Sequence, residues 1–229
     1  MADAVPQADA KSTAFGIKDC ALVVLATGRK ARLLQELRSE VSHADTASIY
    51  HHFWGSLLQP RLEEREYNND FAEWVRHGVH DPTLAERLAA LSPTNYPDLE
   101  ALRREMVELI DTRLDEAGHH AFAPATIQFE LARSQIVVFD TGRRLAHPRE
   151  LTASIPDLTT GSIFYHFVDA RRRTADGRDD FSDWLAIFGS EVEPLREQLA
   201  AVDPYFGGLH ALRDELAGLF AIHFPEVSP

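Results

Sequence analysis

The chain contains the same pattern of residues twice, so its fold must accommodate two similar halves. Ser48–Phe53 reappears 114 positions later as Ser162–Phe167, with four of the six residues identical. Other matches follow in the same order with few gaps: Phe15 and Phe129, Thr27-Gly28-Arg29 and Thr141-Gly142-Arg143, Asp70-Phe71-x-x-Trp74 and Asp180-Phe181-x-x-Trp184, Ala101-Leu102-Arg103 and Ala211-Leu212-Arg213. Chance does not explain so many ordered matches, and they favour an internal duplication.

The spacing of the matches divides the chain into two repeats and three other segments. The predicted parts are a disordered leader (1–14), a first repeat (15–114), a linker (115–126), a second repeat (127–224) and a tail (225–229). The period is much longer than the roughly 20–45 residues of a solenoid repeat, which favours duplication of a whole domain. A packed pair buries a larger fraction of its surface than either repeat alone. We therefore expect two homologous halves in a pseudo-two-fold arrangement.

The charge and the cysteine content restrict the partners and the compartment. The formal net charge of −13 repels phosphate backbones and anionic lipid, which argues against nucleic acid and membranes as partners. Cys20 is the only cysteine, so no intramolecular disulfide can form, as in a reducing compartment. Residues 1–14 lack the apolar segment of a signal peptide, and the apolar run 21–26 is far shorter than the roughly 20 residues that span a bilayer. These features predict a cytoplasmic protein.

Hydrophobic periodicity predicts a mostly helical fold, of the α+β type with a minor β element in each half. One helix is expected from near Pro97 to Leu114, with an apolar stripe along one face, and its counterpart from Leu209 to Phe220. A further helix pair is expected at 32–41 and 148–155.

Two Val-rich segments, 21–26 and 135–140, occupy matching places in the repeats. Their β-branched residues and the Thr-Gly that follows favour short strands. A helix that ends at glycine fits them as well. The sequence does not decide between these alternatives.

Asp70 and Asp180 each precede an apolar helical pattern and are followed three residues later by Glu73 or Asp183. This is the arrangement of a capping box, so we expect both aspartates to cap helices rather than to act as acids or bases. The large aromatic residues at helical spacing behind them are expected in the cores: Phe71, Trp74, Phe181 and Trp184.

Two basic clusters persist in this acidic chain, one in each repeat. They share a Thr-Gly-Arg motif followed by a second cation: Thr27, Gly28, Arg29 and Lys30 in the first repeat, and Thr141, Gly142, Arg143 and Arg144 in the second. Glycine lets backbone amides approach an anion, and arginine binds phosphate or carboxylate with paired N–H groups, so these residues are the candidate anion site. The alternative is a tight turn with a solvated basic rim. The basic run 171–173 is predicted to be solvated surface charge.

Both repeats retain a histidine, His52 and His166, four residues after a serine that stands where an N-cap is expected. These serines are Ser48 and Ser162. A histidine between large apolar residues is most often a buried core residue whose ring nitrogens bond to backbone groups. We expect this role for both histidines.

A more specific interpretation is that the histidines of the first repeat bind a metal ion together. The candidates are His51, His52, His77 and His80. His77 and His80 have the spacing that places two ligands on one face of a helix, although Gly78 interrupts the pair. The second repeat replaces three of the four histidines, by Tyr165, Phe188 and Glu191. Any metal or ligand site is therefore expected in the first repeat.

Several motifs together resemble those of an uncharacterised bacterial and archaeal family of domains of unknown function. They are Thr27–Ala31, Ser48–Phe53, Tyr67–Trp74, Leu84–Leu88 and Leu99–Arg103. The resemblance covers nearly all of the first repeat and, more loosely, the second. The resemblance implies that the gene lies beside genes for enzymes of trehalose, glycogen or related sugar metabolism. It supplies no catalytic residues.

The chain lacks a G-x-S-x-G elbow, a Walker loop, a dinucleotide fingerprint and a Cys/His nucleophile pair. We interpret it as a cytoplasmic, non-catalytic binding or regulatory module. Its ligand would be a small anion, such as a sugar phosphate or a nucleotide, or a partner protein that docks near the Thr-Gly-Arg motifs. The alternative is a metal-dependent hydrolase that uses the histidines of the first repeat. The sequence identifies no cofactor and leaves open whether the protein is an enzyme.

Overall fold

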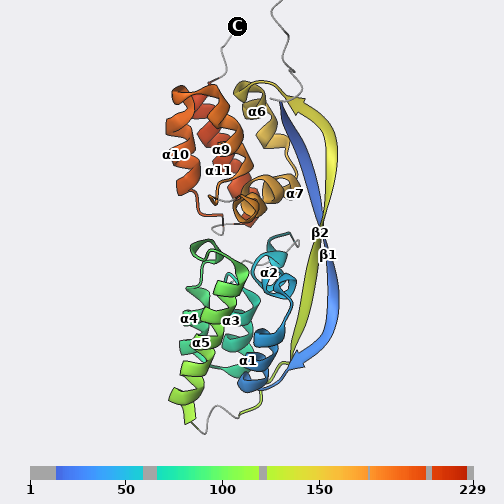
Figure 1. The fold of residues 1–229 in the computed structure, drawn as a ribbon, viewed down its shortest axis with the longest axis vertical. Helices are drawn as coiled ribbons and strands as arrows, with labels where there is room; N and C mark the ends of the chain where they lie inside the picture. Colours follow the sequence, from blue (N-terminus) through green and yellow to red (C-terminus); the bar gives the residue numbers. More distant parts are fainter. Residues whose placement is uncertain (1–13, 59–65, 119–122, 175, 205–207, 226–229) are drawn as a thin grey trace, which may run out of the picture. The chain divides into compact units, whose positions relative to one another are not determined.

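The protein is mostly helical and contains a two-stranded sheet (Figure 1). The computed structural model describes residues 14–58, 66–118, 123–174, 176–204 and 208–225. Most of the predicted leader and tail, and part of the predicted linker, lie outside these residues. No helix within the described ranges combines the length and the apolar character that a membrane span requires.

The two Val-rich segments belong to two long strands, β1 (Phe15–Ala31) and β2 (Phe129–Leu145), whose arrows point in opposite directions (Figure 1). The strand alternative is therefore correct, but the strands are longer than expected. Each contains one glycine with left-handed backbone, Gly28 at φ 76° and Gly142 at φ 75°. Glycine adopts this conformation at little cost, as in β-bulges, which bend a strand without ending it.

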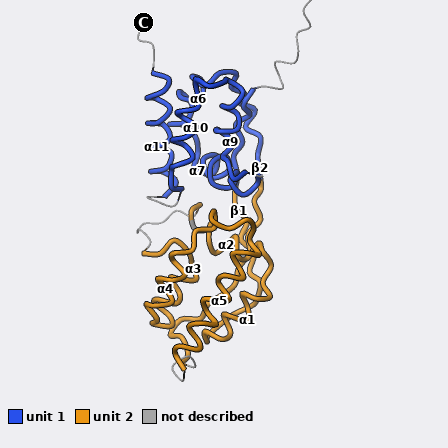
Figure 2. The backbone as a smooth tube through the Cα atoms, turned by 60° about the vertical axis from the view of Figure 1, so that its left-hand side comes forward, with its two compact units in different colours: residues 1–20, 138–229 blue, residues 21–137 orange. Residues whose placement is uncertain are grey.

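The chain forms two compact units, and the boundaries between them fall inside the strands (Figure 2). Unit 2 comprises residues 21–137, and unit 1 comprises the residues before and after this range. β1 therefore passes from unit 1 into unit 2 after Cys20, and β2 passes from unit 2 into unit 1 after Val137. The compact units thus do not follow the two sequence repeats.

The helices of unit 2 come from the first repeat. Those described are α1 (Leu34–His43), α2 (Thr46–Trp54), α3 (Asp70–Trp74), α4 (Pro82–Ala89) and α5 (Leu99–Ala117). α5 begins just after Pro97 and buries Leu102, Met106 and Ile110, as the apolar stripe predicts. A π-helical turn, Val75–Val79, follows α3.

The helices of unit 1 come from the second repeat. Those described are α6 (Pro148–Ser154), α7 (Thr160–Ile163), α8 (Ala170–Arg173), α9 (Asp180–Leu185), α10 (Glu193–Ala201) and α11 (Gly208–His223). α11 has the predicted amphipathic pattern and buries Leu209, Leu212, Leu216 and Phe220. A buried π-helical segment, Phe164–Asp169, connects α7 to α8. It occupies the place that the regular helix α2 has in unit 2.

The first residue of each strand completes the core of the unit built from the helices of the other repeat. In unit 1 the ring centroid of Phe15 lies 5.3 Å from that of Trp184. In unit 2 the ring centroid of Phe129 lies 5.6 Å from that of Trp74. The prediction that the helical aromatic residues are buried is confirmed for Phe71, Trp74, Phe181 and Trp184. Each helical core thus depends on a strand segment from the other repeat.

The caps of α3 and α9 lie one residue before the predicted positions. Asn69 and Asp179 are the caps, and their side chains accept hydrogen bonds from backbone N–H groups in the first turn. The prediction that Asp70 and Asp180 are caps is wrong. Both are the first residues inside their helices, where the side chain no longer faces the unpaired amides.

The serines before the retained histidines are not caps either. α2 is capped by Asp45 and α7 by Thr159, each three residues before the serine that the sequence suggested. Ser48 and Ser162 lie within the helices and are buried. Asp and Thr are also preferred N-cap residues, so residue type alone did not locate the helix start.

Replacing Phe15 with alanine should destabilise unit 1, although Phe15 belongs to the first repeat. Loss of a buried phenylalanine typically costs about 3–5 kcal/mol, and the free energy of unfolding should fall by about that amount. Hydrogen–deuterium exchange should become faster in α9 and α11, with α3 and α5 less affected. Phe129→Ala is the matched variant, and exchange should become faster in α3 and α5, with α9 and α11 less affected. Faster exchange mainly in α3 and α5 of the Phe15→Ala protein would contradict the exchange of strands between repeats.

Candidate functional site

Two histidines connect the strands to the helices at matching places. In unit 1 the backbone N–H of Lys18 donates to Nε2 of His166 at 2.9 Å. In unit 2 the backbone N–H of Ala132 donates to Nε2 of His52 at 3.1 Å. The two amides are 114 positions apart in the sequence, and so are the two histidines. The prediction of buried histidines that bond to backbone groups is confirmed, although each amide belongs to a strand of the other repeat.

The other ring nitrogen of each histidine faces the first aspartate of the next helix. Nδ1 of His52 lies 2.9 Å from Oδ2 of Asp70, and Nδ1 of His166 lies 2.8 Å from Oδ2 of Asp180. Because Nε2 accepts from an amide, it carries a lone pair, and the ring proton is on Nδ1, which donates to the carboxylate. Asp70 and Asp180 therefore orient the histidine rings, which explains why both are retained without capping.

Part of the predicted metal site is brought together in unit 2. His51, His52 and Asp70 each place one ligand atom within 4.8 Å of the others. His77 and His80 are both exposed and contribute no ligand atom to this cluster. The backbone of His80 has a φ of 62° and ends the π-helical turn, which takes it out of the helical register that the spacing assumed.

The hydrogen bonds of His52 make the cluster a poor fit for a metal. Nε2 accepts from the amide of Ala132 and Nδ1 donates to Asp70, so a metal on either nitrogen would break one of these bonds. Transition-metal sites typically use three or four protein ligands. With His52 engaged, the cluster offers too few.

His51 is buried, and its Nδ1 has no hydrogen-bond partner among the described residues. Burial lowers the pKa of its imidazole to about 4, with a further decrease from the neighbouring His52 and an opposing effect from Asp70. The ring is therefore neutral near pH 7. The matching position in unit 1 is Tyr165.

The predicted anion ligands lie on the strands, and their side chains have partners within the protein. The hydroxyl of Thr27 donates to the carbonyl of Leu131 at 2.5 Å, and that of Thr141 donates to the carbonyl of Ile17 at 2.6 Å. The cations also have partners: Arg29 pairs with Glu40, Lys30 with Glu130, Arg143 with Ser154 and Arg144 with Asp140. These contacts hold the strands in place, and a role of Gly28, Gly142 and their neighbours in anion binding stays a prediction.

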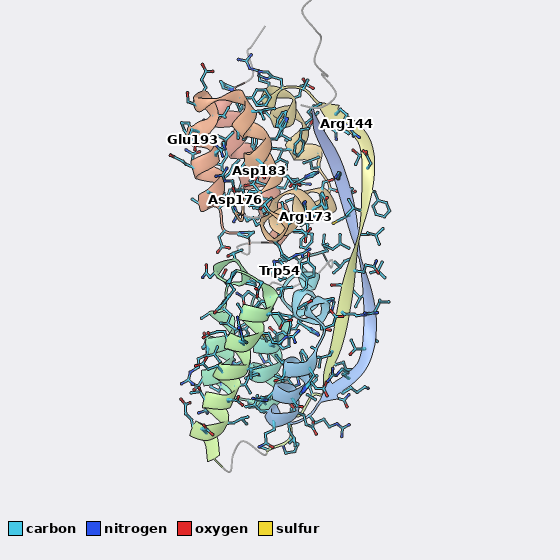
Figure 3. The ribbon with its side chains drawn as sticks, in the orientation of Figure 1. Trp54, Arg144, Arg173, Asp176, Asp183 and Glu193 are labelled. Carbon is cyan, nitrogen blue, oxygen red and sulfur yellow. The ribbon has the colours of Figure 1, made fainter. Side chains whose placement is uncertain are left out.

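A cleft of about 400 Å³ in unit 1 gathers cations from both strands and from the helices. Its charged lining consists of Lys18 on β1, Asp140 and Arg144 on β2, Arg173 at the end of α8 and Asp180 at the start of α9. Figure 3 labels two of these cations, Arg144 beside the strands and Arg173 among the helices. The lining has one more positive than negative charge, in a protein whose net charge is −13.

Arg173 is held rigidly in this cleft. Its Nε donates to the carboxylate of Asp169 at 2.8 Å, and its Nη2 donates to the carbonyl of Tyr165 at 2.9 Å and to Asp180 at 3.0 Å. The guanidinium carbon lies 4.1 Å from the centroid of the Tyr165 ring. Asp169 is only 2% exposed, so it needs a paired cation. The two N–H groups of Nη1 have no partner among the described residues.

The environment of Arg173 refines one expectation from the sequence. Arg172 and Arg173 are exposed, as expected of surface charge, but all three arginines of the run 171–173 also have partners within the protein. Arg171 donates to the carbonyls of Leu199 and Val202, and both Arg172 and Arg173 bond to Asp169. The buried carboxylate belongs to the π-helical segment, and such segments are often found at functional sites.

The remaining charges of the cleft differ in how far they are neutralised. Lys18 is exposed, and its ammonium has no carboxylate within salt-bridge distance among the residues that the structure covers; it lies 5.7 Å from the Tyr165 ring centroid. Asp140 pairs with Arg144, and this hydrogen bond, with a second from the amide of Gly142, holds the pKa of Asp140 well below its usual value. Lys18 is therefore the most available cation.

Asp180 remains ionised. Burial acts to raise the pKa of its carboxyl, but the hydrogen bond from His166 and the charge of Arg173 outweigh burial and lower it. Both bonds use Oδ2. The carboxylate of Asp180 thus links His166, which binds the strand amide of Lys18, to the guanidinium of Arg173.

The matching positions in unit 2 do not reproduce this lining. Ala132 stands in place of Lys18, and His51 in place of Tyr165. Lys30 stands in place of Arg144, and its ammonium pairs with Glu130 at 2.9 Å. The differences between the repeats at these positions are the signal by which the sequence alone could have located the cleft. No motif marked Lys18, and the sequence analysis noted Tyr165 only as the replacement of His51 and Arg173 only as part of a basic run.

The fold and the cleft define a mostly helical protein with no recognised catalytic centre in its described residues. The chain belongs to DUF5752, a family of unknown function, which matches residues 12–221. This agrees with the resemblance noted in the sequence. The structure is similar to that of OrfY from Thermoproteus tenax, with a TM-score of 0.78 and 27% identity over 92% of this chain and 95% of that one. A comparison with curated proteins finds no match.

The neutral His51 predicts a pH dependence of stability. Its pKa of about 4 in the folded protein lies below the ordinary histidine value of 6.5, so the unfolded chain binds more protons than the folded chain between pH 4 and 6.5. Stability should therefore fall as the pH decreases from about 6.5 towards 4, by an amount on the order of 1–3 kcal/mol. The free energy of unfolding, measured with urea at pH 7 and at pH 5, should decrease less between these pH values in His51→Gln than in the unaltered protein. The same loss in both proteins would show that His51 does not titrate in this window.

Proposed function

We propose that the protein is a non-catalytic binding module for a small anion, and that the anion binds in the cleft of unit 1. The observation that carries the proposal is the state of Arg173. Three hydrogen bonds fix its guanidinium, yet both N–H groups of Nη1 are without a partner among the described residues. A fixed donor with unused hydrogen bonds is what an anion site requires, because little side-chain freedom is lost on binding.

The other cations support this assignment. Lys18 contributes an exposed ammonium from β1, and Arg144 contributes its positive charge from β2. The net charge of −13 would repel an anion at long range, so attraction must come from cations close to the ligand. Among the cations of the cleft, Arg144 is paired with Asp140, whereas Lys18 has no carboxylate within salt-bridge distance among the described residues. In unit 2, Arg29 and Lys30 are both paired with glutamates.

We also propose that the two halves arose by tandem duplication and that their sites have diverged. The histidine and aspartate pairs occur in both halves at matching positions, which supports a common origin. The cleft combines Lys18 from the first repeat with Tyr165 and Arg173 from the second. A ligand site in the first repeat alone, as the histidine pattern suggested, is therefore less well supported than a site built from both repeats.

A cytoplasmic location is part of the proposal. Cys20 is buried, its thiol donates to the carbonyl of Gly161, and burial followed by the charge of Asp19 raises its pKa to about 12. Such a thiol remains protonated and unreactive. A lone reduced cysteine of this kind fits a reducing compartment.

The second candidate, a metal-dependent hydrolase, is supported by one observation, the cluster of His51, His52 and Asp70. The engaged nitrogens of His52 count against it. Elemental analysis of the purified protein separates the two functions. Zinc, iron or manganese bound one to one would favour the hydrolase over the binding module.

The binding proposal is tested by titration calorimetry with pyrophosphate as the probe. Lys18→Ala places at position 18 the residue that the chain has at 132, and it removes a charge-assisted hydrogen bond worth about 1.5–3 kcal/mol. The dissociation constant should therefore rise by about 10- to 100-fold.

Arg104→Ala is the control for this experiment. Arg104 is an exposed cation on α5 in unit 2, so the variant makes the same change in net charge outside the cleft. It should leave the dissociation constant nearly unchanged. Equal weakening by both variants would show attraction to net charge alone, and no measurable binding by the unaltered protein would reject the cleft as a site for this class of anion.

A further inference from the structure

The donors and acceptors in the cleft that have no partner indicate what the ligand must carry besides an anionic group. On the donor side are the two N–H groups of Arg173 Nη1 and the ammonium of Lys18, none of which has a hydrogen-bond partner among the described residues. On the acceptor side is one carboxylate oxygen, Oδ1 of Asp180, because His166 and Arg173 both bond to Oδ2 of that residue. An oxyanion uses only the donors. A ligand that satisfies the acceptor as well must also carry a proton donor.

The acceptor lies within the same residue cluster as the donors. Asp180 and Arg173 are joined at 3.0 Å through Oδ2 and Nη2. A ligand whose anionic group reaches Nη1 therefore has Oδ1 of the carboxylate close by. Hydroxyl groups are the proton donors that suit an ionised carboxylate without adding charge. The ligand chemistry that fits is an oxyanion with hydroxyl groups a few bonds away.

The aromatic residues of the cleft do not offer a stacking platform for a nucleobase. The Tyr165 ring has the Arg173 guanidinium over it at 4.1 Å. The Phe15 ring is packed against His166, with centroids 4.9 Å apart, and against Trp184. All the aromatic rings of the lining are buried. Binding through base stacking requires an open aromatic face, so this cleft suits a hydroxylated anion better than a nucleotide.

We infer that the ligand of this cleft is a phosphate ester rich in hydroxyl groups, bound through Arg173 and Lys18 at its phosphate and through Asp180 at a hydroxyl. This rests on the proposed function and narrows it, since the sequence left a sugar phosphate and a nucleotide equally open. The carboxylate selects for hydroxyl groups, because an apolar ester would leave Oδ1 of Asp180 without a hydrogen-bond donor.

Titration calorimetry on the unaltered protein tests the inference with matched probes. Hexose 6-phosphate and n-hexyl phosphate carry the same anionic group, but only the first has hydroxyl groups. A charge-assisted hydrogen bond from a hydroxyl predicts that the hexose phosphate binds at least about tenfold more tightly. Ribose 5-phosphate and AMP differ by the base, and they should bind with similar dissociation constants. AMP binding tenfold more tightly would overturn the inference.

Asp180→Asn locates the hydroxyl contact. The asparagine oxygen is expected to replace Oδ2, where it can still accept from His166 and Arg173, and this places an uncharged amide N–H₂ where Oδ1 was. The preference for hexose 6-phosphate over n-hexyl phosphate should then shrink to a few-fold. Asp70→Asn is the matched control, since it changes the equivalent histidine partner in unit 2, and it should preserve the full preference.

The outcomes separate this inference from the proposed function. If both esters bind equally well to the unaltered protein, the anion site stands and the hydroxyl contact is rejected. If none of the phosphate esters binds, the proposed function itself fails. A preference that survives Asp180→Asn would assign the hydroxyl contact to another residue and overturn the role of Asp180. The comparison of probes on the unaltered protein does not depend on the folding of any variant.

Discussion

The hydrogen bond from a strand amide to a buried histidine is the interaction on which the packing of strand against helices depends within each unit. It fixes the start of each strand on helices that belong to the other repeat, through His166 in unit 1 and His52 in unit 2. The aspartate behind each ring keeps the proton on Nδ1, so that Nε2 remains an acceptor. Because the bond in unit 1 is made by the amide of Lys18, it also brings the side chain of Lys18 to the cleft.

The sequence predicts the features of the fold that are encoded locally. The spacing of apolar residues within a single segment is enough to predict the helices α5 and α11. The same spacing predicts the buried aromatic residues. The strands were harder to predict because Val23 and Val24 are both exposed, so the middle of β1 lacks the alternation that marks a half-buried strand. The exchange of strand segments between repeats is a non-local arrangement, and no spacing within one repeat encodes it.

The candidate site was predictable only in part. The retained histidines were recognised as core residues, but their partners are backbone amides 80 and 148 residues away in sequence, which no motif describes. The aspartates looked like caps because the true caps, Asn69 and Asp179, stand immediately before them. Arg173 was expected to be surface charge and is exposed, but its bond to Asp169 was not predicted, because that carboxylate is buried on the preceding π-helical segment. The positions that differ between the repeats favoured a histidine site in the first repeat and did not lead to the cleft.

Nitrogen NMR of the full-length protein measures whether His52 and His166 accept hydrogen bonds from strand amides. Both rings should show a protonated Nδ1 and an unprotonated Nε2. A scalar coupling should connect Nε2 of His166 to the amide nitrogen of Lys18, and another should connect Nε2 of His52 to that of Ala132. Rings protonated on Nε2, without coupling to these amides, would contradict the account.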